Sequence, residues 1–95
     1  MAAWLYIVKC NDGSYYTGTT RTDLELRIAQ HNAGFYGGFT SSRRPVTLCF
    51  SERFERIEDA ISAERQIKGW SRSKKEALIA GDFVRLQDLS KRRSK

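Results

Sequence analysis

The sequence predicts an α+β fold, with a small three-stranded, mostly antiparallel sheet flanked by helices in the order β-β-α-β-α-α. Residues 3–10 and 14–19 are rich in aromatic and β-branched residues and flank Asn11-Asp12-Gly13, which is typical of a β-hairpin. A third alternating run follows Pro45, and helical start and stop signals mark the segments around it. At 95 residues we expect one domain, near the lower end of what folds without disulfides or metals.

The length of the hairpin loop decides which face each tyrosine occupies. A three-residue loop with Gly13 in the left-handed conformation pairs position 6 with 18 and position 8 with 16. This register, which we expect, puts Tyr6 and Tyr16 on one face of the sheet, whereas a two-residue loop would separate them. It also sets Gly18 opposite Tyr6 and leaves room above the tyrosine ring.

The first helix is predicted over residues 23–32. Thr22 and Glu25 form a capping box at its start, and Gly34 follows its end. Residues 34–45 are rich in Gly, Ser and Arg and are predicted to form a loop.

The third strand is predicted to start at Pro45, where the missing backbone donor does no harm. Val46, Leu48 and Phe50 then alternate with polar or small residues as far as about Phe54. The pattern favours a strand that pairs with the hairpin.

Two further helices complete the predicted fold. The second covers residues 57–68 and stops at Gly69. Ser73 and Glu76 form a capping box for a short third helix that ends at Gly81.

The basic residues are concentrated at the C-terminal end. Residues 65–95 hold 10 of the 17 Lys and Arg but only 3 of the 11 Asp and Glu, within a net charge of +6. This asymmetry favours a polyanionic partner, with nucleic acid first and an acidic membrane surface second. We divide the chain into a domain of residues 1–82 and a basic tail of residues 83–95 that is partly helical or disordered, with residues 91–95 expected to be disordered.

Several classes of protein are excluded or disfavoured. No apolar run reaches 18 residues, so no membrane span is expected, and the N-terminal apolar run lacks the basic start of a secretory signal. Of the two polyanionic partners, we expect nucleic acid and not a membrane. Cys10 and Cys49 show no metal-binding spacing and fit reduced thiols of a cytoplasmic protein. No obligate protein partner is inferred.

Glu64 lies at the centre of an apolar stripe on the second predicted helix, framed by Ala60, Ile61 and Ile67. An ionised carboxylate there is costly unless it is paired or bound to a metal. The structural alternative is an ion pair with Lys68, four residues later, whose stem reaches solvent.

Arg27 and His31 lie beside the buried stripe of the first helix, which Leu24 and Ile28 mark. A lone histidine at such a boundary is more often a satisfied structural residue than a catalyst. Arg27 stays charged and therefore needs an acceptor, either in the protein or on a ligand such as phosphate.

Two tyrosines, an arginine, a histidine and a glutamate are thus predicted to converge on one side of the sheet. A single carboxylate suits Mg²⁺, which keeps several waters and borrows phosphate oxygens from its substrate. Arginine stabilises the negative charge that develops on a phosphate, and a tyrosine acts as a base if nearby positive charge lowers its pKa from about 10. The set therefore predicts hydrolysis of a phosphodiester.

The same positions resemble the signature of the GIY-YIG nucleases. Tyr6 and Tyr16 lie ten residues apart across a hairpin, Gly18 follows, and Arg27, His31 and Glu64 come in the family's order and spacing. The resemblance covers residues 3 to about 80 and is closest to the small standalone bacterial subgroup. The first triplet reads Trp-Leu-Tyr and lacks the usual glycine, and Thr19 and Thr20 stand where some relatives carry a lysine.

The resemblance implies a role for each of these residues. Tyr6 is the general base or orients the attacking water, and Tyr16 supports that water and the phosphate. Arg27 contacts the scissile phosphate, and His31 assists by hydrogen bonding or proton transfer. Glu64 binds Mg²⁺ or Mn²⁺. Tyr15 is left to pack on the other face of the sheet.

Other cations are candidates for positioning the nucleic-acid backbone without reading its sequence. They lie in the loop before the third strand and around the start of the third helix: Arg43, Arg44, Lys68, Arg72, Lys74 and Lys75. Phosphate contact and a merely solvated loop are equally good interpretations of four of the loop residues: Thr40, Ser41, Arg43 and Arg44. Phe35, Tyr36 and Phe39 either stack on unpaired bases or pack within the loop.

The leading hypothesis is a divalent-metal-dependent endonuclease that acts on branched, flapped or single-stranded DNA with little sequence specificity, with RNA left open as a substrate. DNA repair or recombination is the role that the resemblance implies. One alternative is a nucleic-acid-binding module of the same fold with degraded catalysis. Another is a small interaction protein in which the tyrosines and Glu64 are structural.

Overall fold

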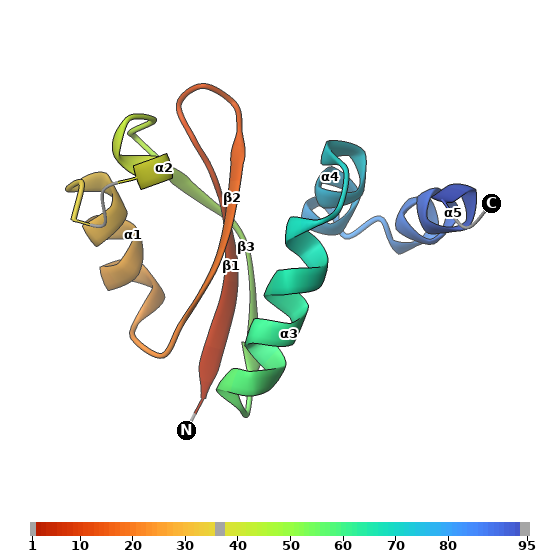
Figure 1. Cartoon of the computed structure of the whole chain (residues 1–95), viewed down its shortest axis with the longest axis horizontal. Helices are drawn as coiled ribbons and strands as arrows, with labels where there is room; N and C mark the ends of the chain where they lie inside the picture. Colours follow the sequence, from red (N-terminus) through yellow and green to blue (C-terminus); the bar gives the residue numbers. More distant parts are fainter. Residues whose placement is uncertain (1, 36–37, 94–95) are drawn as a thin grey trace.

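The computed structural model describes the backbone of residues 2–35 and 38–93 and the side chains as far as Lys91. Its three strands form one antiparallel sheet in the order β2-β1-β3, which confirms the predicted fold class. Helices α1 and α2 lie on one side of the sheet, and α3 and α4 lie on the other, with α5 beyond α4 (Figure 1). The elements are β1 (Ala3–Lys9), β2 (Tyr15–Thr20), α1 (Leu24–Asn32), α2 (Gly38–Ser41), β3 (Thr47–Phe54), α3 (Ile57–Lys68), α4 (Arg72–Ala80) and α5 (Phe83–Arg93).

The hairpin has the register that the three-residue loop requires. Tyr6 pairs with Gly18, and Val8 pairs with Tyr16. Gly13 has a φ of +86°, and its N–H donates to the Cys10 carbonyl at 2.9 Å. Because side chains alternate along a strand, this register places Tyr6, Tyr16 and Gly18 on the same face.

The central strand β1 is buried on both faces and divides the core in two. Its Leu5 and Ile7 pack against α3 and α4, where Ile67 and Leu78 complete one cluster. The other face forms a second cluster of buried residues with partly buried neighbours from α1 and β2, namely Tyr6, Val8, Cys10 and Val46 with Tyr16, Leu24 and Ile28. The side of the sheet that carries Tyr6 is therefore the side covered by α1.

Two helix caps differ from the predicted ones. Asp23, and not Thr22, caps α1, because its carboxylate accepts the Glu25 N–H at 2.8 Å. The Thr22 hydroxyl is instead bonded to Thr20 Oγ1 at 2.7 Å. Asp is also the stronger capping residue of the two.

The cap of helix α4 lies two residues before the predicted one. Ser71 accepts the Lys74 N–H, and Ser73 lies inside the helix. Glu76 pairs with Arg72 at 3.1 Å, so its carboxylate does not serve the predicted capping box. The predicted end is correct, because Gly81 closes the helix in the left-handed conformation.

A bulge interrupts the predicted alternation of the third strand. Ile7 pairs with Phe50 and Val8 with Leu48, which leaves Cys49 without an opposing residue. Val46 consequently packs on the α1 side, whereas Phe50 packs on the α3 side. Leu48 is 39% exposed.

Two segments are more regular than the sequence indicated. The predicted loop of residues 34–45 contains the short helix α2. The tail forms α5 as far as Arg93, so the prediction of disorder is wrong for residues 91–93, and residues 94–95 lie outside the described part. Leu86 of α5 packs against the α3-side core. None of the described helices is long and apolar enough to cross a membrane.

Candidate active site

Tyr6 is a hydrogen-bonded tyrosine inside the core. It is 2% exposed, and its hydroxyl oxygen lies 2.9 Å from His31 Nε2. A Cβ atom at position 18 would lie 2.6 Å from that oxygen, so the ring fits only because residue 18 is glycine. The prediction that Gly18 leaves room for the Tyr6 ring is confirmed.

His31 lies in the last turn of α1 and is held from two sides. Its Nε2 faces Tyr6, and its Nδ1 lies 2.8 Å from the Thr40 hydroxyl of α2. Burial, followed by the positive charge of Arg27, lowers the pKa of His31 below its ordinary value of 6.5. The imidazole is therefore neutral at neutral pH and has one nitrogen that accepts a hydrogen bond.

The ring of Tyr16 on β2 contacts side chains from α1, α2 and α3. Its ring meets His31 edge-on with centroids 5.4 Å apart and stacks on Phe39 at 5.9 Å. The Lys68 ammonium lies 5.8 Å from the centre of the Tyr16 ring. The sequence contains no lysine directly after Tyr16, and Lys68 supplies a cation from α3 instead.

Glu64 approaches from the other side of the sheet. Its carboxylate accepts the Thr19 hydroxyl at 3.2 Å, and Thr19 pairs with Leu5, whose side chain faces α3. The expected convergence on one face thus holds for Tyr6, Tyr16 and His31, but Glu64 reaches the group around the edge strand β2. The geometric part of that expectation is wrong, because α3 covers the opposite face from α1 (Figure 1).

Lys68 links Glu64 to Tyr16. Its ammonium lies 2.6 Å from a Glu64 oxygen, in the ion pair that the four-residue spacing predicts. The hydrogen bond to Glu64 raises the pKa of Lys68, which therefore remains charged. The Glu64 side chain is 17% exposed, compared with 50% for Lys68.

The Glu64 region has the donor set that a hard divalent cation prefers. A carboxylate and a hydroxyl oxygen lie together at the edge of β2, and the Lys68 ammonium already places a positive charge against that carboxylate. Mg²⁺ needs few protein ligands because it keeps waters and binds substrate phosphates. The two oxygens therefore suit a hard divalent cation, with which the Lys68 ammonium competes for the carboxylate. Among the described residues, no three His, Cys, Asp or Glu side chains cluster into a complete cage.

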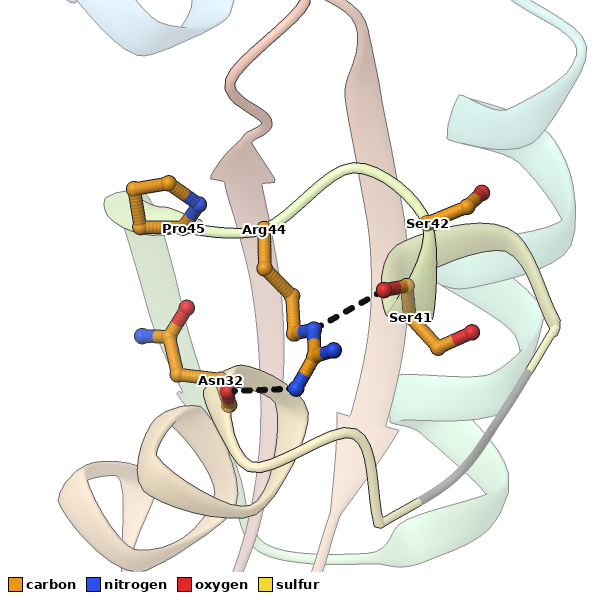
Figure 2. Close-up of a pocket in the computed structure, with 5 residues that line it drawn as sticks. All are labelled: Asn32, Ser41, Ser42, Arg44 and Pro45. Carbon is orange, nitrogen blue, oxygen red and sulfur yellow. Dashed lines mark hydrogen bonds between the residues drawn. The ribbon is translucent and has the colours of Figure 1, made fainter.

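Arg43 and Arg44, two of the predicted backbone contacts, are held by internal bonds. Arg43 pairs with Asp12 at 3.1 Å and donates to the Phe39 carbonyl at 2.8 Å. Arg44 donates to the carbonyls of Ser41 and Asn32, and these residues line an open pocket of about 520 Å³ with Ser42 and Pro45 (Figure 2). Both acceptors end helices, so the Arg44 charge is already complemented by helix dipoles.

The other four predicted contacts lie on α3 and α4. Lys68 is engaged by Glu64, and Arg72 donates to the Gly13 carbonyl at 2.8 Å while packing over Tyr15. Lys74 is 7% exposed, with its ammonium 4.5 Å from the centre of the Trp70 ring. Lys75 is half-buried. Their contact with nucleic acid stays a prediction, and Lys74 is the least accessible of the four.

The loop aromatics are placed differently from one another. Phe35 is 70% exposed, whereas Phe39 packs against Tyr16 and carries the Arg43 guanidinium 3.9 Å above its ring. Phe39 therefore already has ring and cation partners within the protein. Tyr36 lies outside the described residues.

Sequence reasoning missed three contacts of the site. Thr40, for which the sequence predicts either a phosphate contact or a solvated loop position, is 3% exposed and bonded to His31. The Thr19 bond to Glu64 and the Phe39 stack on Tyr16 were also unforeseen. All three depend on long-range packing, and the only local signal was the β-hairpin alternation that turns Thr19 toward α3.

Comparison with known proteins identifies the family of the chain. The model of the GIY-YIG catalytic domain matches residues 2–77. A UPF0213 protein of Halobacterium salinarum is 47% identical over 75 residues, which cover 79% of this chain and 96% of the relative. The solution structure of a UPF0213 protein from Bacillus halodurans is 40% identical, covers 84% of each chain and superposes with a TM-score of 0.55.

The solution structure of the E. faecalis protein EF2693 is 34% identical, covers 88% of each chain and gives a TM-score of 0.60. The family model spans β1 through most of α4, and with them Tyr6, Tyr16, His31 and Glu64. The chain belongs to the GIY-YIG family of nuclease domains and is related to the small UPF0213 proteins within it.

Proposed function

We propose that the protein is a divalent-metal-dependent endonuclease that hydrolyses DNA phosphodiesters. The observation that carries the proposal is the buried hydrogen bond of 2.9 Å between the Tyr6 hydroxyl and His31 Nε2. A phenol with a pKa of about 10 is a poor base at neutral pH, unless a neighbouring group takes its proton. A neutral imidazole is such a group.

In the proposed reaction, water attacks the phosphorus and gives its proton to Tyr6. Tyr6 passes its own hydroxyl proton to Nε2 of His31. The phenol therefore stays neutral, and the imidazole becomes positively charged. Since Tyr6 is only 2% exposed, we propose that one ordered water reaches its hydroxyl, shielded from bulk solvent. Tyr16, which contacts His31 and lies nearer the surface, supports this water and the phosphate.

The negative charge that develops on the phosphate is shared by two groups of the chain. Arg27, whose charge reaches His31, contacts the scissile phosphate, and the Lys68 ammonium beside Tyr16 adds a second cation. Glu64 would hold Mg²⁺ or Mn²⁺. When bound, the ion supplies Lewis-acid stabilisation of a phosphate oxygen.

The proposed substrates are branched, flapped or single-stranded DNA, cut with little sequence specificity. Support comes from the basic end of the chain, where 10 of the 17 Lys and Arg lie within residues 65–95. Cations of this kind bind phosphate and position a duplex without reading its bases. Repair of DNA is the corresponding proposed role.

A nicking assay tests the proposal. Purified protein is incubated with labelled linear duplex, flap, fork, four-way junction and single strand, in Mg²⁺ or Mn²⁺ and in EDTA. We expect cleavage that requires the metal and falls at least 100-fold in Tyr6→Phe and in Glu64→Gln, since each removes a group that acts in the reaction. Circular dichroism checks that both variants fold. Unchanged cleavage in either variant contradicts the assignment.

The second candidate is a nucleic-acid-binding module of the same fold. The ion pair of 2.6 Å between Lys68 and Glu64 favours it, because the carboxylate proposed to hold the metal is already neutralised by a cation. This alternative predicts retarded bands in a gel-shift assay and no cleavage in either metal. The same set of substrates therefore separates the two functions.

A further inference from the structure

We propose that Thr40 is a positioning residue that fixes the tautomer of His31, with the proton on Nδ1, so that Nε2 accepts the hydrogen bond of Tyr6. The catalytic consequence rests on the proposed nuclease function. The tautomer itself is a property of the folded chain and needs neither substrate nor metal.

Three buried polar groups form a continuous row. The Tyr6 hydroxyl lies 2.9 Å from Nε2 of His31, and Nδ1 lies 2.8 Å from the Thr40 hydroxyl. The exposed fractions of Tyr6, His31 and Thr40 are 2%, 3% and 3%. Little water competes for these bonds, so the protein groups on each side of the ring decide its protonation pattern.

The acidity of the two hydroxyls sets the direction of the bonds. A neutral imidazole has one donor nitrogen and one acceptor nitrogen. The phenol of Tyr6 is far more acidic than the alcohol of Thr40, so it is the better donor, and the alcohol is the better acceptor. Tyr6 therefore donates to Nε2, and Nδ1–H of His31 donates to Thr40.

This arrangement also suits the charged ring that forms in the reaction. When Tyr6 gives its proton to Nε2, the imidazolium still donates Nδ1–H to Thr40, and no group has to turn. Within residues 2–35 and 38–93, the titratable or charged groups recorded against His31 are Arg27 on α1, Tyr6 on β1 and Tyr16 on β2. The positive charge of Arg27 disfavours the imidazolium, whereas the Thr40 hydroxyl of α2 stabilises it by accepting Nδ1–H.

Helix α2 is well placed to hold this acceptor. Its Phe39 stacks on Tyr16, and Arg43 after the helix donates to the Phe39 carbonyl and pairs with Asp12 of the hairpin loop. The segment that carries Thr40 is thereby tied to the same hairpin that carries both tyrosines.

The test is long-range ¹H–¹⁵N NMR of the labelled protein, in which the chain's single histidine gives one imidazole spectrum. We expect protonated Nδ1 in the wild type, loss of this tautomer as the major form in Thr40→Val, and its recovery in Thr40→Ser. A wild type protonated on Nε2, or the same tautomer in Thr40→Val, overturns the proposal. The wild-type spectrum decides the tautomer even if Thr40→Val fails to fold.

A matched control is Thr17→Val, which makes the same change at a threonine that is also 3% exposed. Thr17 pairs with Ile7, which faces α3, and its hydroxyl has no hydrogen-bond partner among the described residues. We expect this control to keep both the His31 tautomer and the cleavage rate. A tautomer change in the control equal to that in Thr40→Val overturns the specific role of Thr40.

Kinetics then measure the consequence for catalysis. Thr40→Val is expected to lower kcat about 10- to 100-fold, as loss of an orienting partner of a histidine typically does, with KM little changed. Loss of the acceptor disfavours the imidazolium, so the NMR titration of His31 and the acid limb of the rate profile both move to lower pH. A titration that stays in place contradicts the proposal. An inactive wild type with protonated Nδ1 overturns the nuclease function and leaves the tautomer assignment intact.

Discussion

The ring of Tyr6 lies directly against the backbone of Gly18, and this contact explains why the hairpin carries a glycine in a strand. A Cβ atom there would lie 2.6 Å from the phenol oxygen and 2.7 Å from Cζ. The tyrosine has no easy escape, because its hydroxyl is bonded to His31 and its surroundings are closed. The glycine is therefore explained by packing rather than by turn geometry.

Gly18→Ala is expected to destabilise the fold by about 1–3 kcal/mol, the usual cost of overpacking a core, and to weaken cleavage by displacing Tyr6. Urea unfolding and the nicking assay measure the two effects. The control is Gly69→Ala, whose new Cβ would meet its nearest atom, the Gln66 carbonyl oxygen, at an ordinary 3.6 Å. Equal stability of the two variants would show that Tyr6 is held less rigidly than the structure indicates.

The buried imidazole of His31 makes stability depend on pH. Its pKa in the folded chain lies below the ordinary 6.5, so between these two values the unfolded chain binds more protons than the folded one. The contribution of His31 to the free energy of unfolding is therefore fully present above about pH 6.5 and is lost as the pH falls from there through the lower pKa of the folded chain. The pKa values of Asp12 and Glu58 are also lowered. These two carboxylates make stability depend on pH only near and below their ordinary pKa values of 3.8 and 4.5.

We expect the free energy of unfolding, measured in urea from pH 8 to pH 5, to be flat at first and then to fall. In His31→Gln, which does not titrate, the curve should stay flat down to about pH 5, with a lower plateau because the bonds to Tyr6 and Thr40 are altered. A wild-type curve that rises on acidification would mean that the folded histidine prefers the charged form.

At the scale of single elements, local signals predicted where the helices and strands lie better than they predicted the caps of α1 and α4 or the bulge in β3. The 6–18 register followed from one left-handed glycine, and the bounds of α3 are those that the apolar spacing and Gly69 predicted. Thr22 and Ser73 both satisfy the capping pattern, but neither caps its helix. The Thr22 hydroxyl is bonded to Thr20, and Ser71 caps α4 in place of Ser73. The bulge at Cys49 has no local signature because it depends on how β3 meets β1.

The cap of α4 gives a direct test of this competition. Ser71→Ala should cost about 1 kcal/mol, within the range of 0.5–2 found for caps, because it removes the acceptor of the Lys74 N–H. Ser73→Ala is the matched control and should change stability by less than about 0.5 kcal/mol, since this serine is exposed inside the helix. Thermal unfolding of both variants measures the difference, and a larger loss in Ser73→Ala would restore the predicted capping box.

At the scale of the whole molecule, the candidate site straddles the edge strand of the sheet. Helical and strand periodicity identified Tyr6, Tyr16, His31 and Glu64 as polar residues on inward-facing positions. Periodicity gives the face of each element, however, and not the side of the sheet on which the element packs. This is why the sequence predicted the members of the group but not the approach of Glu64 from the α3 side or its link to Tyr16 through Lys68.

This layout makes Lys68 a competitor of any cation that Glu64 binds. Lys68→Met removes the ammonium that lies 2.6 Å from the carboxylate and keeps much of the side-chain volume. The affinity of the free protein for Mn²⁺ should rise, by up to about fivefold, because a partly exposed ion pair is worth no more than about 1 kcal/mol. Isothermal titration calorimetry without DNA measures this change separately from cleavage.

Arg65→Met is the matched control, since it removes an equal charge from an exposed neighbour of Glu64 on the same helix. General loss of positive charge would raise Mn²⁺ affinity equally in both variants, whereas direct competition raises it mainly in Lys68→Met. Glu64→Gln should abolish binding in either background. If Lys68→Met binds Mn²⁺ no better than the Arg65 control, the ammonium and the metal do not share the carboxylate, and the metal ligand must be sought elsewhere than Glu64.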